Sequence, residues 1–306
     1  MIHVIGNAAI DTIIRLERLP LPGETVIAEG AAEDLGGKGA NQAVMIARCG
    51  LPVRLVAAIG DDAQGRRIRD NLAMENVMTD GLWSWPGPTD RCSIYVDRHG
   101  ENTIVSLIGA AQAFDPLVST AAADWIQDGD HVLFQGNLRS DVLRRCLGLA
   151  RSKGAVTVLN PSPISGSSGY EWGHVDIAVM NRGEAEILGG SKLPREAAER
   201  LLGLGAGRVV VTLGSEGAML LGQGEDVALR APSIEPVDST GAGDVLCGTL
   251  VAALAKGLSW SLALRVAVEA AACKVTRPGV FASFPSRVEL ERIFAETTGP
   301  QSMRGA

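Results

Sequence analysis

Strand-length apolar runs alternate with helix-length segments through the middle of the chain, and this alternation restricts the fold more than any other feature. The expected strands span residues 131–135, 155–160, 175–180 and 208–213. The expected helices span residues 116–127, 140–153, 182–188 and 194–204. Strands that alternate with helices form a mostly parallel sheet covered by helices. The sequence therefore predicts an α/β fold.

The first third of the chain contains β-rich segments that do not fit this alternation. Residues 25–31 are expected to pair back onto residues 12–17, and residues 92–107 have the pattern of a hairpin. We expect these segments, about 12–31 and 92–107, to form a small β lid on the main domain. No internal repeat or low-complexity linker interrupts the sequence, so residues 1–306 are expected to form a single domain.

Composition and charge argue against several classes of function. The net charge is −7, with 28 basic and 35 acidic residues and no basic block, so no nucleic-acid partner is expected. The longest apolar run, residues 245–255, is eleven residues long and too short to span a bilayer. Five widely spaced cysteines without a C-x-x-C pair, and four scattered histidines, predict neither a disulfide framework nor a zinc site. Residues 1–6 have the pattern of a strand and not of a signal peptide, so we expect a cytoplasmic protein without a membrane segment.

Residues 237–244 form a turn of small residues that leads directly into an apolar helix. Gly241 and Gly243 permit unusual backbone angles and let a ligand approach the main chain closely. The first N–H groups of a helix lack internal partners, and the helix dipole adds positive potential there, so this turn predicts an anion site. Asp244 lies in the first turn of the same helix. Its carboxylate either acts on the ligand or only complements the dipole, which is worth about 0.3–1 kcal/mol.

Residues 36–39 form a second glycine-rich turn before a helix. The turn resembles a phosphate-binding loop, but it lacks the G-x-x-x-x-G-K-[ST] spacing, and no G-x-G-x-x-G fingerprint opens the first helix. The alternative interpretation is a simple helix start at which Asn41 and Gln42 form local hydrogen bonds.

Two further segments follow expected strands. Asn181 and Glu184 have the spacing of a helix capping box, and the alternative role for Glu184 is to act near a hydrated magnesium ion. Residues 212–217 offer small residues and exposed amides at a strand end. Ligands of open α/β sheets bind outside the carboxyl ends of the strands, so this segment is a candidate binding loop.

Taken together, residues 36–43, 181–184 and 237–244 resemble the signatures of the ribokinase (PfkB) family of sugar kinases, in the family's order. Residues 20–25 and 160–163 are also similar to the family. The resemblance implies a three-layer αβα sandwich around a mostly parallel sheet, with a small β lid. It also implies ATP as phosphate donor, Mg²⁺ as cofactor, and phosphorylation of a primary hydroxyl of a sugar.

The resemblance implies a role for each matching residue. Asp244 corresponds to the general base, and the amides of Gly241, Ala242 and Gly243 correspond to the anion hole. The residues implied to bind the sugar are Asp11, Gly37, Lys38 and Asn41. The residues implied on the nucleotide side are Asn181, Glu184 (which would act on Mg²⁺ indirectly), Thr212 and Gly214. A monovalent cation, K⁺, is implied near residues that offer several carbonyl ligands: Asp238, Thr240, Val275, Gly279 and Ser283.

Two positions depart from the pattern of ribokinases. Ala9 stands where they usually carry an asparagine, and Asn137 stands where they carry a glutamate. We place Asn137 among the substrate-binding residues. Because hydrogen-bonding groups in a closed pocket control specificity strongly, ribose is only the first choice of sugar.

Two alternative functions stay open at this point. A nucleoside kinase of the same family would need an apolar pocket beside the sugar, which Trp83, Trp85 and Tyr95 would line unless they fill the core or the lid. A catalytically silent sugar-binding regulator would have no chemical need for Asp244. Because exposed strand edges tend to pair, we also expect a homodimer through the lid.

Overall fold

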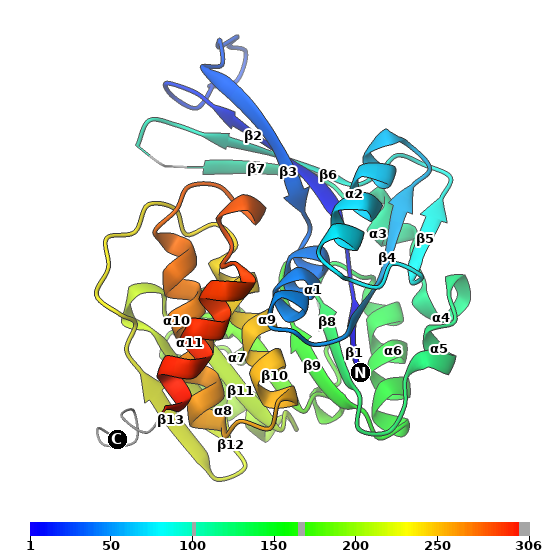
Figure 1. Ribbon diagram of the computed structural model, residues 1–306, viewed down its shortest axis with the longest axis vertical. Helices are drawn as coiled ribbons and strands as arrows, with labels where there is room; N and C mark the ends of the chain where they lie inside the picture. Colours follow the sequence, from blue (N-terminus) through cyan, green and yellow to red (C-terminus); the bar gives the residue numbers. More distant parts are fainter. Residues whose placement is uncertain (100–101, 165–168, 300–306) are drawn as a thin grey trace.

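The chain forms two separate β-sheets, and the smaller one extends away from the body that contains the larger one (Figure 1). The computed structural model of the protein describes residues 1–99, 102–164 and 169–299. Within these residues, no helix is long and apolar enough to cross a membrane.

As far as the structure describes the chain, the larger sheet has nine strands and is mostly parallel. In sheet order the strands are β13 (Glu225–Leu229), β12 (Ala218–Gly222), β11 (Arg208–Thr212), β10 (Ile177–Asn181), β9 (Val156–Asn160), β8 (His131–Gln135), β1 (Ile2–Ile5), β4 (Val53–Gly60) and β5 (Leu82–Trp85). All neighbouring strands from β11 to β5 pair in parallel, whereas β12 pairs antiparallel with both of its neighbours, β11 and β13. The carboxyl ends of the parallel strands therefore lie along one edge of the sheet.

Helices cover both faces of this sheet. The helices on one face are α1 (Lys38–Arg48), α2 (Ala63–Met74), α9 (Ala242–Ala255), α10 (Trp260–Val275) and α11 (Arg287–Thr298). The helices on the other face are α3 (Gly109–Ala113), α4 (Pro116–Ser119), α5 (Ala122–Trp125), α6 (Ser140–Ser152), α7 (Arg182–Gly189) and α8 (Pro194–Gly203). Successive strand residues point to opposite faces, so Val4 enters one core and Ile5 the other. The predicted three-layer sandwich is confirmed.

The smaller sheet is the lid. Its strands, in order, are β3 (Gly30–Gly36), β2 (Ala9–Arg15), β6 (Arg91–Val96) and β7 (Asn102–Leu107). The prediction that residues 25–31 pair back onto residues 12–17 is wrong in its bounds, because only residues 30 and 31 of that segment pair there. The second strand begins at Gly30, and Asp11 lies opposite Asp34. This register buries Leu35 beside the body, and the lid therefore reaches to residue 36.

Two other local predictions need correction. The single helix expected over residues 116–127 is divided at Thr120, whose hydroxyl donates to the Pro116 carbonyl and accepts from the Ala122 amide. Side-chain hydroxyls that bond the nearby backbone compete with helical hydrogen bonds, so the segment forms the short helices α4 and α5. The edge strand β5 was not predicted.

Candidate active site

The two glycine-rich turns of the sequence begin helices α1 and α9. Gly37 precedes α1 with φ at 88°, and an added Cβ would lie 2.8 Å from the backbone of Ala8. Gly241 precedes α9 with φ at 81°, and an added Cβ would lie 2.9 Å from the Phe284 ring. Only glycine adopts this backbone conformation without strain and leaves room for these neighbours.

Side chains from the start of α1 hold the Asp244 carboxylate. Asn41 Nδ2 donates to Oδ2 at 3.0 Å, and Gln42 Nε2 donates to Oδ1 at 2.9 Å. The ammonium of Lys38 lies 3.8 Å from Oδ1. The interpretation in which Asn41 and Gln42 bond locally is therefore wrong, because both donate across more than 200 residues of sequence. Asp244 is 5% exposed and does more than complement a helix dipole.

A second layer of amides orients Gln42. Gln135 Nε2 donates to Gln42 Oε1 at 2.7 Å, and Gln42 Nε2 also donates to Asn160 Oδ1 at 3.0 Å. Asn160 in turn donates to the Val179 carbonyl at 2.8 Å. These contacts direct the NH₂ group of Gln42 toward Asp244. Sequence reasoning missed Gln135. The available signal was that Gln135 and Asn160 each end an expected strand, and the two residues lie opposite each other at the carboxyl ends of β8 and β9.

Several buried polar atoms around this network have no partner within the described residues. They belong to Asp11 (Oδ1), Asn41 (Oδ1), Gln135 (Oε1) and Asn137 (Oδ1 and Nδ2). Buried polar atoms in folded proteins are normally hydrogen-bonded, and a set of unpaired ones marks a place for a ligand with several hydroxyls. Three of the five predicted sugar-binding residues, Asp11, Asn41 and Asn137, share this property.

The Asp11 carboxyl group lies against Gly36, where a Cβ would come within 2.1 Å of its Oδ1. Burial raises the pKa of Asp11 to about 6, and the charges of Asp244 and Asp34 add to the rise while Lys38 opposes it. The lid strand thus carries a carboxyl group into the same electrostatic environment as Asp244.

A cavity of about 870 Å³ lies between the lid and the body. From the lid it is lined by residues such as Ile13 and Val96, and from the body by Thr212, Gly214 and Gly243. An added Cβ at Gly243 would meet no atom within 4 Å, so the start of α9 is open to this cavity. The start of the helix is therefore accessible, as an anion site requires.

The three predicted anion-hole amides differ in availability. The Ala242 amide already donates to the Ser239 carbonyl at 3.1 Å. For the amides of Gly241 and Gly243, no backbone acceptor occurs in the described part of the chain. Two of the three amides are thus free for a ligand.

Asn181 and Glu184 form the capping box that their spacing allows. Asn181 Oδ1 accepts from the Glu184 amide at 2.8 Å, and Glu184 Oε2 accepts from the Asn181 amide at 2.9 Å. The other carboxylate oxygen, Oε1, has no hydrogen-bond partner within the described ranges. Asn181 also lies opposite Thr212 in the sheet, which brings the two predicted nucleotide segments together.

The charges of Glu184, Asp244 and Lys38 all influence the buried Cys247 thiol of α9. Burial raises the pKa of the Cys247 thiol, and the charges of Asp244 and Glu184 add to this rise while Lys38 opposes it. The three charged groups therefore act on one point of α9.

The five residues predicted around a monovalent cation do come together, and polar groups of four of them, Asp238, Val275, Gly279 and Ser283, are engaged in protein hydrogen bonds. The Asp238 carboxylate accepts from the amides of Thr240 (2.8 Å) and Gly279 (3.0 Å). The Val275 carbonyl accepts two amides, and the Ser283 hydroxyl donates to the Gly279 carbonyl at 2.9 Å. The described residues thus do not present an open set of ligands for K⁺.

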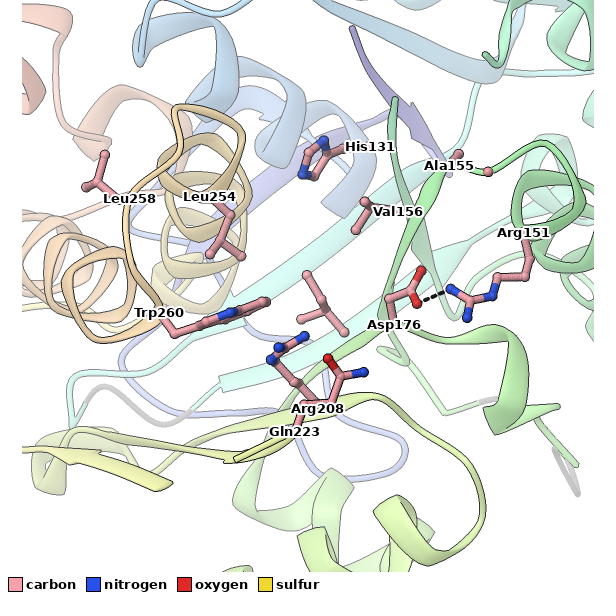
Figure 2. A pocket seen from close by; sticks show the side chains of 12 residues that line it. His131, Arg151, Ala155, Val156, Asp176, Arg208, Gln223, Leu254, Leu258 and Trp260 are labelled. Carbon is pink, nitrogen blue, oxygen red and sulfur yellow. Dashed lines mark hydrogen bonds and ion pairs between the residues drawn. The ribbon is translucent and has the colours of Figure 1, made fainter. Parts of the chain in front are cut away.

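A second cavity, of about 440 Å³, opens at the other edge of the sheet, near the amino ends of β8 to β11 (Figure 2). Its walls include the Arg208 guanidinium, which stacks over the Trp260 ring at 4.1 Å, and the Arg151–Asp176 ion pair. None of the predicted site residues lines it. Predicted site residues such as Thr212, Gly214, Ala242 and Gly243 line the lid-side cavity, whereas Asp244 and the predicted sugar-binding residues are among the described lining residues of neither cavity.

The aromatic residues considered for a nucleoside pocket are used elsewhere. Trp83 stacks with Phe114 in the core at a centroid distance of 6.0 Å, and Trp85 donates to the Pro88 carbonyl. Neither these residues nor Tyr95 are among the described residues that line the lid-side cavity.

The raised pKa of Asp11 predicts a pH-dependent stability of the unliganded protein. Because the pKa is about 6 in the folded state and its ordinary value is 3.8, the contribution of Asp11 is most favourable below about pH 4 and is lost as pH rises through 6. Asp11→Asn should match the wild type near pH 4 and exceed its free energy of unfolding above about pH 7, by up to about 3 kcal/mol. Urea unfolding at several pH values measures this, and parallel pH profiles of the two proteins would contradict it.

Comparison with known proteins shows the family of the chain. The pfkB family of carbohydrate kinases matches residues 1–287. Ribokinase of Bacillus subtilis is 31% identical over 294 residues, covering 96% of this chain and 99% of the relative. The structure of Thermotoga maritima ribokinase is 30% identical, with a TM-score of 0.88 over 95% of this chain and 98% of that chain. The structure of Arabidopsis thaliana ribokinase complexed with ribose and ATP is 28% identical, with a TM-score of 0.86 over 96% and 98%. The chain is therefore a member of the pfkB family of carbohydrate kinases.

Proposed function

We propose that this protein is an ATP-dependent kinase that transfers the γ-phosphate to a primary hydroxyl of a ribose-like sugar. The observation that carries the proposal is the position of Asp244. Its carboxylate lies at the start of α9, beside two free backbone amides and near the unpaired polar atoms of Asp11 and Asn41. A base, an anion site and a hydroxyl-binding site are thus adjacent.

The sugar hydroxyls satisfy the unpaired atoms in this proposal. Asp11, Asn41 and Asn137 provide acceptors and donors on several sides, and Lys38 adds a charged donor. Asp244 then accepts the proton of the reacting hydroxyl as the oxygen attacks phosphorus. General base catalysis of this kind contributes about 10²–10⁴-fold to the rate. The donors Asn41 and Gln42 hold the carboxylate in place without neutralising it.

The phosphate side depends on backbone groups more than on side-chain cations. The free N–H groups of Gly241 and Gly243, with the dipole of α9, offer positive potential to the transferred phosphoryl group. Thr212 and Gly214 line the same cavity, and the apolar side chains of Val268 and Ala271 suit the face of a purine. The structure of Arabidopsis thaliana ribokinase complexed with ribose and ATP supports ATP as the phosphate donor.

Mg²⁺ is the cofactor in this proposal, and Glu184 fits it. Mg²⁺ keeps several waters and needs few protein carboxylates, and the unbonded Oε1 of Glu184 is available to one of those waters. When bound, the ion neutralises charge on the phosphates. The capping box holds the Glu184 side chain at the start of α7.

The alternative functions have less support. The placement of Trp83 in the core removes the main aromatic candidate for a nucleoside-base pocket. A silent sugar-binding regulator does not account for three side-chain contacts to one carboxylate, those of Asn41, Gln42 and Lys38 with Asp244. Nor does it account for Gln135, which donates to Gln42 and orients it.

The base assignment predicts the phenotype of Asp244→Asn. The variant should fold and bind ATP, but its kcat should fall by at least about 10²-fold, because it cannot take up the hydroxyl proton. ADP release with ATP, Mg²⁺ and a panel of pentoses, hexoses and nucleosides measures this and identifies the preferred acceptor in the wild type. Retention of more than about a tenth of the wild-type kcat would show that Asp244 is not the base.

The open start of α9 predicts that Gly243→Ala separates stability from activity. The added methyl group meets no protein atom, so the variant should be as stable as the wild type or more stable by up to about 1 kcal/mol. The same methyl group projects where the phosphate would approach, and we expect kcat/KM for ATP to fall by about 10²-fold.

Gly203→Ala in α8 is the matched control, since its added Cβ also meets no atom within 4 Å and lies outside the cavity. It should leave kinetics unchanged. Wild-type kinetics in Gly243→Ala would refute the anion site at Gly243.

We also propose a cytoplasmic homodimer joined through the lid. All five cysteines are free thiols in the structure, which suits a reducing compartment. Strands β3 and β7 are the two edges of the lid sheet as the described residues form it, and β7 exposes Ile104, Val105 and Leu107. Light scattering in dilute solution should give twice the chain mass of 31.9 kDa, whereas a purely monomeric species would contradict the dimer.

A further inference from the structure

Lys274, in the last turn of α10, is completely buried. Its ammonium donates to the Asp238 carbonyl oxygen at 2.7 Å and lies 3.9 Å from Asp238 Oδ1. Lysine is almost never fully buried unless it is paired, because removing an ammonium group from water is costly. The proposed reaction steps do not use this charge, so its presence needs another explanation.

The location of the ammonium supplies that explanation. Asp238 lies three residues before Gly241, and its carboxylate binds the amides of Thr240 and Gly279. The ammonium therefore holds the loop of residues 238–241, which leads to the free amides at the start of α9, through its bond to the Asp238 carbonyl. Asp238 is also one of the residues predicted to surround a monovalent metal ion.

We propose that the Lys274 ammonium is a built-in cation that takes the place of a monovalent metal ion beside Asp238 and positions the anion-binding loop. The enzyme consequently works without K⁺. The kinetic part of this inference rests on the proposed kinase function, whereas the thermal part does not.

Two features of the surroundings support the substitution. Three of the other four expected ligands, namely the Val275 carbonyl, the Gly279 carbonyl and the Ser283 hydroxyl, already take part in protein hydrogen bonds. A metal ion at the Asp238 carbonyl would also meet the ammonium already bound there, with a single nearby carboxylate to balance two positive charges. Burial lowers the pKa of Lys274, but the charge of Asp238 opposes this fall and favours the ammonium form.

The test compares the wild type with Lys274→Ala and Lys274→Met in KCl and in tetramethylammonium chloride at equal ionic strength. The readouts are Tm and kcat/KM for ATP. Wild-type values should be the same in both salts. In tetramethylammonium chloride, Lys274→Ala should lose about tenfold or more in kcat/KM, as expected when a hydrogen bond from a charged group is removed.

Potassium should rescue only the variant that leaves space for it. KCl should raise both the Tm and the kcat/KM of Lys274→Ala, because the ion enters the vacated position and stabilises the folded state that binds it. Lys274→Met keeps the length of the side chain without its charge, so it should be impaired in both salts. Lys192→Ala, which removes a lysine remote from this loop in the sequence, is the control for loss of charge and should behave as the wild type.

Three results would overturn the proposal. They are activation of the wild type by K⁺, unchanged kinetics of both Lys274 variants, and an equal response of Lys274→Met and Lys274→Ala to K⁺. If Lys274→Ala does not fold, the salt response of the wild type and the impairment of Lys274→Met still decide. If no sugar is phosphorylated by the wild type, the kinase function fails, while the Tm comparison continues to test the ammonium.

Discussion

The structure depends on a buried carboxylate that joins the starts of two helices. Asp244 in α9 accepts hydrogen bonds from both Asn41 and Gln42 of α1. A buried charge is tolerated only when it is well hydrogen-bonded, so α1 and α9 must keep this relative position. Gly248 permits it, since a Cβ there would lie 2.8 Å from the Gln42 carbonyl oxygen. The packing of α1 against α9 therefore also brings the residues of the site together.

The lid and the sheet edge give this carboxylate its surroundings. The lid brings Asp11 to the same place from a separate sheet, while β8 and β9 bring Gln135 and Asn160. The lid-side cavity is lined from the body by Thr212, Gly214 and Gly243, the last of which precedes Asp244 directly in the chain. Every group proposed to act on the sugar or the phosphates therefore lies at the carboxyl ends of the strands or on the lid above them, which is where open α/β sheets bind ligands.

The fold and half of the site were accessible from the sequence because they depend on local patterns. Alternating strands and helices predicted the mostly parallel sheet covered by helices, and the small-residue turn predicted an anion site at Gly241. The three-layer sandwich and the sugar-binding roles were implied by the resemblance to the pfkB family. The partners of Asp244 were not accessible in the same way, since Gln42 is 202 residues distant and its spacing also suited a local bond. Lys274 shows the limit most clearly. A lysine in a helix is usually exposed, and only the packing of α10 against the loop at Asp238 reveals its burial.

The most direct test of the account is a crystal structure with ribose and a non-hydrolysable ATP analogue bound together. The account predicts the γ-phosphate on the amides of Gly241 and Gly243, with a primary hydroxyl oxygen about 2.6–3.2 Å from the Asp244 carboxylate. A sugar that binds with no hydroxyl near Asp244, or a nucleotide in the cavity beside Arg208 at the opposite edge of the sheet (Figure 2), would contradict it.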